Sequence, residues 1–231
     1  MNAKNENVGS FKEHVASELN ENHSNVKAVV SVVMAIWLGI VFLLGSQGVF
    51  AGGADSPPLP IFFGFAIPLG VFFSAYFGWG AFRSFVLNAD LRLVAAIQAW
   101  RWAGFGFLAL YAHGILPGLF AFPAGLGDMA VGISAPWIVS GLIRDPRFAA
   151  SRRFVTWNIF GILDLVVALS LGTLCSGFFL HGLKVTSASM SQLPSVLIPA
   201  YFVPLFIMLH FTALSQARRL ARAGKSMPVT I

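Results

Sequence analysis

Residues 157–172 read WNIFGILDLVVALSLG, a run of apolar residues with the carboxylate of Asp164 near its middle. The run has neither the strict alternation of a half-buried strand nor the polar stripe of a surface helix. With its apolar flanks it extends over 154–176, which at about 1.5 Å per residue is enough to cross a hydrocarbon core roughly 30 Å thick. The stretch therefore predicts a transmembrane helix that carries an ionisable group.

The rest of the chain repeats this pattern. Of its 231 residues, 57% are hydrophobic and only 10% are charged, whereas soluble domains carry about a quarter charged residues. Continuously apolar blocks exclude the alternating strands of a barrel, so we predict an all-α integral membrane protein with six transmembrane helices in a domain over 27–217. The predicted spans are 27–50, 59–82, 93–117, 127–144, 154–176 and 195–217.

The basic residues predict the orientation of these helices. The first and third predicted loops contain no Lys or Arg, and the fifth contains only Lys184, whereas the second and fourth loops and both ends of the chain are basic. By the positive-inside rule both termini, including a basic tail over 218–231, are expected to be cytoplasmic, in a multi-pass protein of the inner membrane. Because most basic residues flank apolar blocks, the net charge of +6 does not indicate nucleic acid as a partner.

The N-terminal segment, residues 1–26, is polar, and the apolar block that follows is too long for a signal peptide. Ser10 and Glu13 fit a capping box, which predicts that a short amphipathic helix begins there. We expect this helix to lie on the membrane surface or to dock onto a partner protein. Its apolar face would carry Phe11, Val15 and Leu19.

Ionisable residues inside predicted spans are the candidates for a functional site. Counted inward from the cytoplasmic ends, Arg101, Asp164 and His210 lie at a similar level, roughly 10–15 Å deep. Gln98 and Asn158 lie closer to the cytoplasmic surface. Arg101 and Asp164 at matched depth would neutralise each other, either as a structural ion pair that sets helix register or as part of a solute or proton site.

Small residues predict which way Asp164 faces. At helical spacing, Gly161 and Ala168 lie on the same side of the span as Asp164. Such residues allow another helix to approach closely. We therefore expect Asp164 to point at protein and not at lipid.

A second polar group is expected toward the outer face. His113 lies near the outer end of the third span, Asp128 begins the fourth, and His181 lies in the fifth loop. Asp128 would be favoured in a first helical turn, after a loop over 118–127 that could be re-entrant. These residue types suit a divalent metal or, for the histidines, haem, but their spacing fits no motif. No cofactor is therefore expected, and the single cysteine, Cys175, excludes a Cys-based metal cluster.

Two spans contain residues that favour helix interruption. Pro136 falls in the middle of the fourth span, and Pro199 and Pro204 fall in the outer half of the sixth. Proline removes a backbone donor and favours kinks. Interrupted helices often form the binding sites of transporters.

The sequence leaves three functions open. It has no nucleotide-binding loop and no metalloprotease helix, so an enzyme is not favoured. The first hypothesis is a transporter, or transporter subunit, for a small solute, an ion or a proton, with its site in the inner half of the membrane. The alternative is a non-catalytic partner that assembles with other membrane subunits or with copies of itself. The third is a haem or metal protein of electron transfer. In each case the lipid bilayer is an expected partner.

Overall fold

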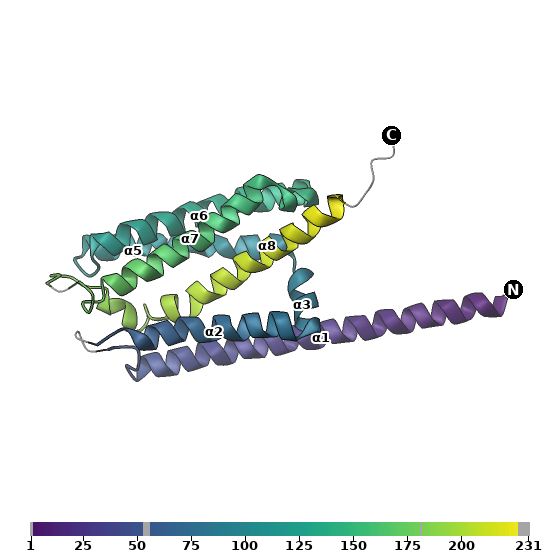
Figure 1. Ribbon diagram of the computed structural model, residues 1–231, viewed down its shortest axis with the longest axis horizontal. Helices are drawn as coiled ribbons and strands as arrows, with labels where there is room; N and C mark the ends of the chain where they lie inside the picture. Colours follow the sequence, from purple (N-terminus) through teal and green to yellow (C-terminus); the bar gives the residue numbers. More distant parts are fainter. Residues whose placement is uncertain (1, 53–55, 181, 226–231) are drawn as a thin grey trace.

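The computed structural model describes residues 2–52, 56–180 and 182–225, and every regular element in these ranges is helical (Figure 1). The α-helices are α1 (Asn2–Ser46), α2 (Leu59–Gly78), α3 (Gly80–Leu87), α4 (Leu91–Ile97), α5 (Phe105–Ala112), α6 (Gly118–Arg144), α7 (Arg152–Leu174) and α8 (Val203–Lys225). The 3₁₀-helices are η1 (Gln98–Gly104), η2 (Pro146–Ala150) and η3 (Ala188–Ser191), and η4 (Ile198–Phe202) is a π-helix.

Within the described residues, six helical segments are long and apolar enough to cross a membrane, which confirms the predicted number. The third combines α4, η1 and α5, and the sixth combines η4 with α8. The spans are Ser24–Ser46, Leu59–Gly78, Leu91–Ala112, Gly118–Arg144, Arg152–Leu174 and Ile198–Ala223.

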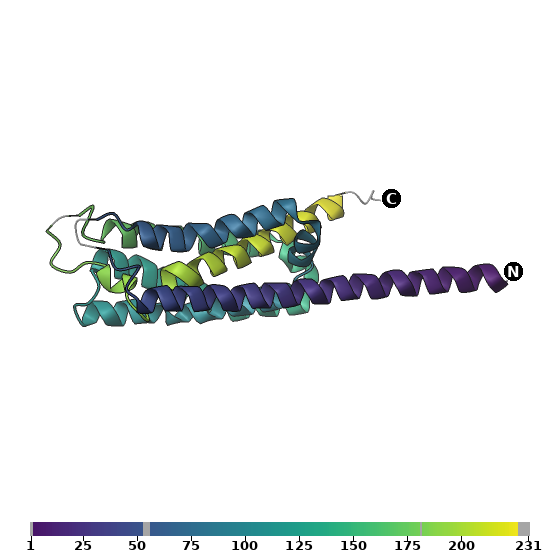
Figure 2. The same cartoon turned by 90° about the horizontal axis from the view of Figure 1, so that it is seen from below.

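The helices form two layers with one helix between them. In Figure 1, α1 and α2 lie at the bottom, α5, α6 and α7 lie at the top, and α8 runs diagonally from one layer to the other. Figure 2 shows that α1 and α2 are set apart within their layer. In keeping with this position, α8 contacts α2, α4 and α7. Both termini and α3 lie at one end of the bundle, which we call the terminal end.

The fourth span begins earlier than predicted. Residues 118–127, predicted as a loop that could be re-entrant, are the first turns of α6. Asp128 is therefore not in a first helical turn but ten residues after Gly118. The helix also continues through Pro123 and Pro136 without the expected interruption. Membrane helices tolerate such prolines, because neighbouring helices can compensate for the lost hydrogen bond.

The first helix is longer than expected. A helix was predicted to begin at Ser10, but α1 runs without a break from Asn2 to Ser46. Figure 1 and Figure 2 show its N-terminal part projecting past the other helices at the terminal end. The side chains of Phe11, Val15 and Leu19, which were predicted to form the apolar face, lie outside the part of the chain whose side chains the structure describes.

Two irregular segments lie within spans. The 3₁₀-helix η1 is in the middle of the third span, and the π-helix η4, which contains Pro199, begins the sixth. Proline cannot donate the backbone hydrogen bond that a regular helix needs, which accounts for an irregular start there. Mid-helix 3₁₀ and π segments often mark functional positions.

Asp90 caps α4, and this cap leads to a testable prediction. Its carboxylate accepts a hydrogen bond from the backbone N–H of Arg92 at 2.9 Å and forms an ion pair with the Arg92 guanidinium. We expect Asp90→Ala to lower the free energy of unfolding by about 1 kcal/mol, measured by thermal unfolding in detergent.

The same cap has a defined pH dependence. The side-chain hydrogen bond to Arg92 lowers the pKa of Asp90 below its ordinary value. A carboxylate with a lowered folded pKa stabilises the protein above the unfolded pKa, and the stabilisation is lost as the pH falls through the folded pKa. The difference between Asp90→Ala and wild type should therefore shrink as the pH falls below about 4, and disappear only below the lowered folded pKa. A difference that stays constant into acid would contradict the ionic cap.

Candidate functional site

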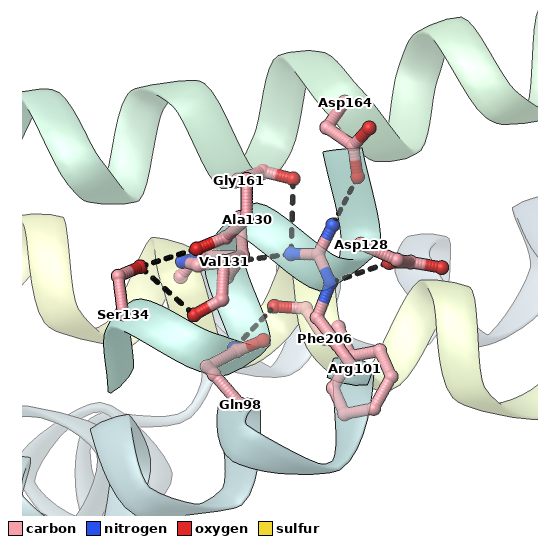
Figure 3. A network of polar contacts seen from close by, with 10 residues as sticks. Gln98, Arg101, Asp128, Ala130, Val131, Ser134, Gly161, Asp164 and Phe206 are labelled. Atoms are coloured by element: carbon pink, nitrogen blue, oxygen red, sulfur yellow. Dashed lines mark hydrogen bonds and ion pairs between the residues drawn. The ribbon is translucent and has the colours of Figure 1, made fainter. Parts of the chain in front are cut away.

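The guanidinium of Arg101 lies between two carboxylates from different helices (Figure 3). Arg101 belongs to η1; its Nε donates to Oδ1 of Asp128 on α6 at 2.7 Å, and its Nη2 donates to Oδ2 of Asp164 on α7. Its Nη1 donates to the carbonyl of Gly161 at 3.3 Å. The side chain of Arg101 is 0% exposed, against 15% for Asp128 and 6% for Asp164. The expected pairing of Arg101 with Asp164 is confirmed, and Asp128 is a second partner.

His210 on α8 joins the guanidinium to Asn158 on α7. Nε2 of His210 lies 3.0 Å from Nη1 of Arg101, and Nδ1 lies 2.9 Å from Oδ1 of Asn158. Because a guanidinium can only donate, Nε2 must accept, so the ring proton is on Nδ1 and is donated to Asn158. The Asn158 amide group donates in turn to the carbonyl of Phe154 at 2.8 Å, which fixes its orientation. His210 is therefore a neutral imidazole in this arrangement.

Gln98 lies on the same face of η1 as Arg101, because residues three apart eclipse one another in a 3₁₀-helix. Its Nε2 donates to the carbonyl of Phe206 at 3.4 Å (Figure 3). Since that carbonyl can only accept, the orientation of the amide is set, and Oε1 is left as an acceptor. Gln98 is 1% exposed, and its Oε1 has no hydrogen-bond partner.

The structure thus brings together all five residues that the sequence analysis selected and adds Asp128. We call this group the charged cluster; it consists of Gln98, Arg101, Asp128, Asn158, Asp164 and His210. All except Asp128 are buried. Asp128 was expected in the outer group because the predicted fourth span begins at residue 127, nine residues after the true start of α6 at Gly118. Gly125 and Gly132 lie at helical spacing from Asp128, on the same side of α6. This spacing could have indicated that Asp128 faces a neighbouring helix.

Glycines make room for the charged cluster. A Cβ atom on Gly127 would overlap the carboxylate of Asp164, and one on Gly161 would overlap the imidazole of His210. A Cβ atom on Gly132 would overlap the backbone of Trp102 in η1. The close approach expected at Gly161 is therefore confirmed, and it is the ring of His210 on α8 that comes near.

The formal charges of the cluster do not balance. Arg101 contributes one positive charge, and ionised Asp128 and Asp164 contribute two negative charges, while His210 is neutral. The surroundings are apolar and aromatic: the Phe206 ring lies 5.8 Å from Cζ of Arg101, and the Trp157 ring lies 5.5 Å from that of His210. An excess buried charge is costly in such a medium. The arrangement is suited to binding a proton, a small cation or the cationic part of a solute.

The expected outer group of possible metal or haem ligands is not assembled in the part of the chain that the structure describes. His113 is exposed at the C-terminal cap of α5, Asp128 is bonded to Arg101, and His181 lies outside the described residues. No described group of three His, Cys, Asp or Glu side chains could hold a metal ion. His210 is also unsuited to be an axial haem ligand, since both of its ring nitrogens are engaged.

Comparison with known proteins places the charged cluster inside a recognised domain. A family described as "Domain of unknown function (DUF8737)" matches residues 58–218. The match includes α2 and every residue of the charged cluster, and α1 precedes it. No curated protein matches the chain. No solved structure matches it either.

Proposed function

The chain belongs to this family of unknown function (DUF8737), and from the charged cluster we propose that it is a transporter, or a transporter subunit, for a small solute, an ion or a proton. The observation that carries the proposal is the placement of Arg101 and two carboxylates inside apolar helices of membrane-spanning length. Ionisable residues at such positions are costly to keep and commonly mark the path of a substrate, ion or proton.

Three features favour a binding site over a purely structural ion pair. A structural pair needs one carboxylate for Arg101, whereas here two are within hydrogen-bond distance. The guanidinium is on η1, an irregular segment of the kind found at functional positions. The third feature is the buried Oε1 of Gln98, an acceptor without a donor. Each feature costs stability, and binding of a ligand would offset that cost.

The distribution of basic residues supports an orientation with the terminal end in the cytoplasm. Basic residues on the elements of this end are Arg83, Arg92, Arg144, Arg147, Arg152, Arg153, Arg218, Arg219 and Arg222. Lys184 lies in the connection between α7 and η3, at the opposite end. By the positive-inside rule this asymmetry favours an inner-membrane protein with both termini inside.

Transport is tested with the full chain in liposomes on a solid-supported membrane. We expect a jump in pH, Na⁺, K⁺, amino acid or sugar concentration to produce a current that saturates with concentration. The current should be lost in Asp164→Asn, because the carboxylate is part of the site. It should be retained in Asp90→Asn, where an exposed cap outside the cluster is changed and Asn can still cap the helix. Currents no larger than those of protein-free liposomes for every jump would contradict transport by the chain itself.

Assembly with another membrane protein is the second candidate, and two observations favour it. The N-terminal part of α1 projects past the bundle (Figure 2). An apolar groove of about 860 Å³ also lies between α1, α2, α4 and α8. Its walls include Ile40, Val71, Leu93 and Leu209. Purification in mild detergent distinguishes the two candidates, since an assembly subunit is expected in a stable heteromeric particle and a self-sufficient transporter in a homogeneous one.

A further inference from the structure

We propose that the charged cluster holds one exchangeable proton on the carboxyl pair of Asp128 and Asp164. The inference rests on the proposed function and deepens it, because it names the ion that the site takes. The proton comes from water, forms an O–H bond with one carboxylate oxygen and returns to water when that bond breaks. No other bond changes, and the formal charge of the cluster alternates between −1 and 0.

The charge count requires a neutralising ion. Arg101 is the one formal positive charge among the described groups of the cluster, since the Nε2 atom of His210 accepts from it and is not protonated. Two ionised carboxylates therefore exceed it by one charge. An uncompensated ion in a low-dielectric interior is strongly disfavoured. Arg101 donates to both carboxylates, and the Gly161 carbonyl and the neutral His210 contact Arg101 in turn. The other polar side chains of the cluster, Gln98 and Asn158, are uncharged amides.

The geometry favours a proton over a metal ion. A metal ion needs several oxygen ligands that converge on one point. Here Asp128 accepts from Nε and Asp164 accepts from Nη2, so each carboxylate is directed at a guanidinium nitrogen (Figure 3). Among the described residues, no group of three His, Cys, Asp or Glu side chains could hold a metal ion. A proton needs only one oxygen atom. Because the side chain of Asp128 is 15% exposed and that of Asp164 is 6% exposed, we assign exchange with water to Asp128.

Gln98 gives an independent indication of a ligand. Its Oε1 is a buried acceptor without a donor, on the same face of η1 as Arg101. Buried amide oxygens are almost always hydrogen-bonded in native proteins. A bound water molecule can supply the donor that this oxygen needs.

The test is a pH titration of the purified full chain by infrared spectroscopy, which detects the carbonyl stretch of a protonated carboxylic acid. We expect wild type to show the carbonyl band of one protonated carboxyl group, and this band should shift in deuterated water. Asp128→Asn and Asp164→Asn should each lose it, because Arg101 then faces a single carboxylate. Asp90→Asn, which changes an exposed carboxylate outside the spans, should retain the band. If Arg101→Gln folds, its band should be about twice as strong, since two carboxylates then lack a counter-charge.

Three results would overturn the inference. One is a wild-type spectrum without a protonated carboxyl at any pH at which the protein is folded. Another is a band that persists in both Asp128→Asn and Asp164→Asn. The third is a band that Na⁺ or K⁺ removes at constant pH, which would make a metal ion the ligand. The infrared spectrum does not depend on transport. A protonated-carboxyl band without transport currents would therefore contradict transport but not the bound proton. Transport currents without this band would contradict the bound proton but not transport.

Discussion

Arg101→Gln should lower the free energy of unfolding by about 3–5 kcal/mol, because it leaves the buried Asp164 and the partly buried Asp128 without their counter-charge. The substitution also removes the donors to the Gly161 carbonyl and to Nε2 of His210. The measurement is thermal unfolding in detergent beside wild type, with size-exclusion chromatography to detect aggregation. The expected result is a markedly lower midpoint and a smaller monodisperse fraction.

Two further variants test the reason for this loss. Asp164→Asn should cost much less than Arg101→Gln, because Asp128 remains as a counter-charge for Arg101. The triple variant Arg101→Gln, Asp128→Asn, Asp164→Asn should recover much of the stability, since a cluster without charges has none to leave unpaired. If Asp164→Asn is as damaging as Arg101→Gln, Arg101 and Asp164 form a dedicated pair and Asp128 contributes little.

The sequence was sufficient to predict the helices and one ion pair. Blocks of apolar residues about as long as the membrane is thick can form little other than spanning helices, so six spans followed from composition and length alone. Depth and helical face then placed Arg101 and Asp164 together. Both predictions depend on the regular rise and turn of an α-helix, which a sequence shows directly.

Asp128 could not be placed in this way, because residues 118–127 contain glycines and a proline that suggest a loop. In the structure the same small residues pack against neighbouring elements: Ala121 and Ala124 are buried, and Gly125 lies against the backbone of Gly104. Tertiary packing thus overrides local propensity over this stretch. The second carboxylate, and with it the charge imbalance, became visible only when the true start of α6 was known.

The 3₁₀ geometry of η1 could not be predicted from the sequence either. Residues 98–104 have no glycine or proline before Gly104 that would indicate a change from α to 3₁₀ geometry. The change places Gln98 on the same face as Arg101, which a regular α-helix would do less closely. Both the unpartnered amide oxygen and the tautomer of His210 depend on contacts between helices, and one sequence does not contain that information.

Gly132→Ala is expected to have the second large effect, because the added methyl group would overlap the backbone of η1. The nearest atoms to a Cβ at this position are the backbone nitrogen of Trp102 and the carbonyl carbon of Arg101. A side chain could rotate away, but a backbone cannot, so α6 and η1 must separate. We expect a loss of at least about 1–3 kcal/mol in the free energy of unfolding, the range for overpacking.

The matched control is Gly70→Ala on α2, where a Cβ atom would meet nothing within 4 Å. Alanine is favoured over glycine in a helix by about 1 kcal/mol, so this variant should be neutral or stabilising. Because Gly132 contacts the segment that carries Arg101, Gly132→Ala should also weaken the infrared band of the protonated carboxyl. A destabilised Gly132→Ala protein with an unchanged band would mean that the cluster withstands separation of α6 from η1, so that its geometry would be held mainly by α7 and α8.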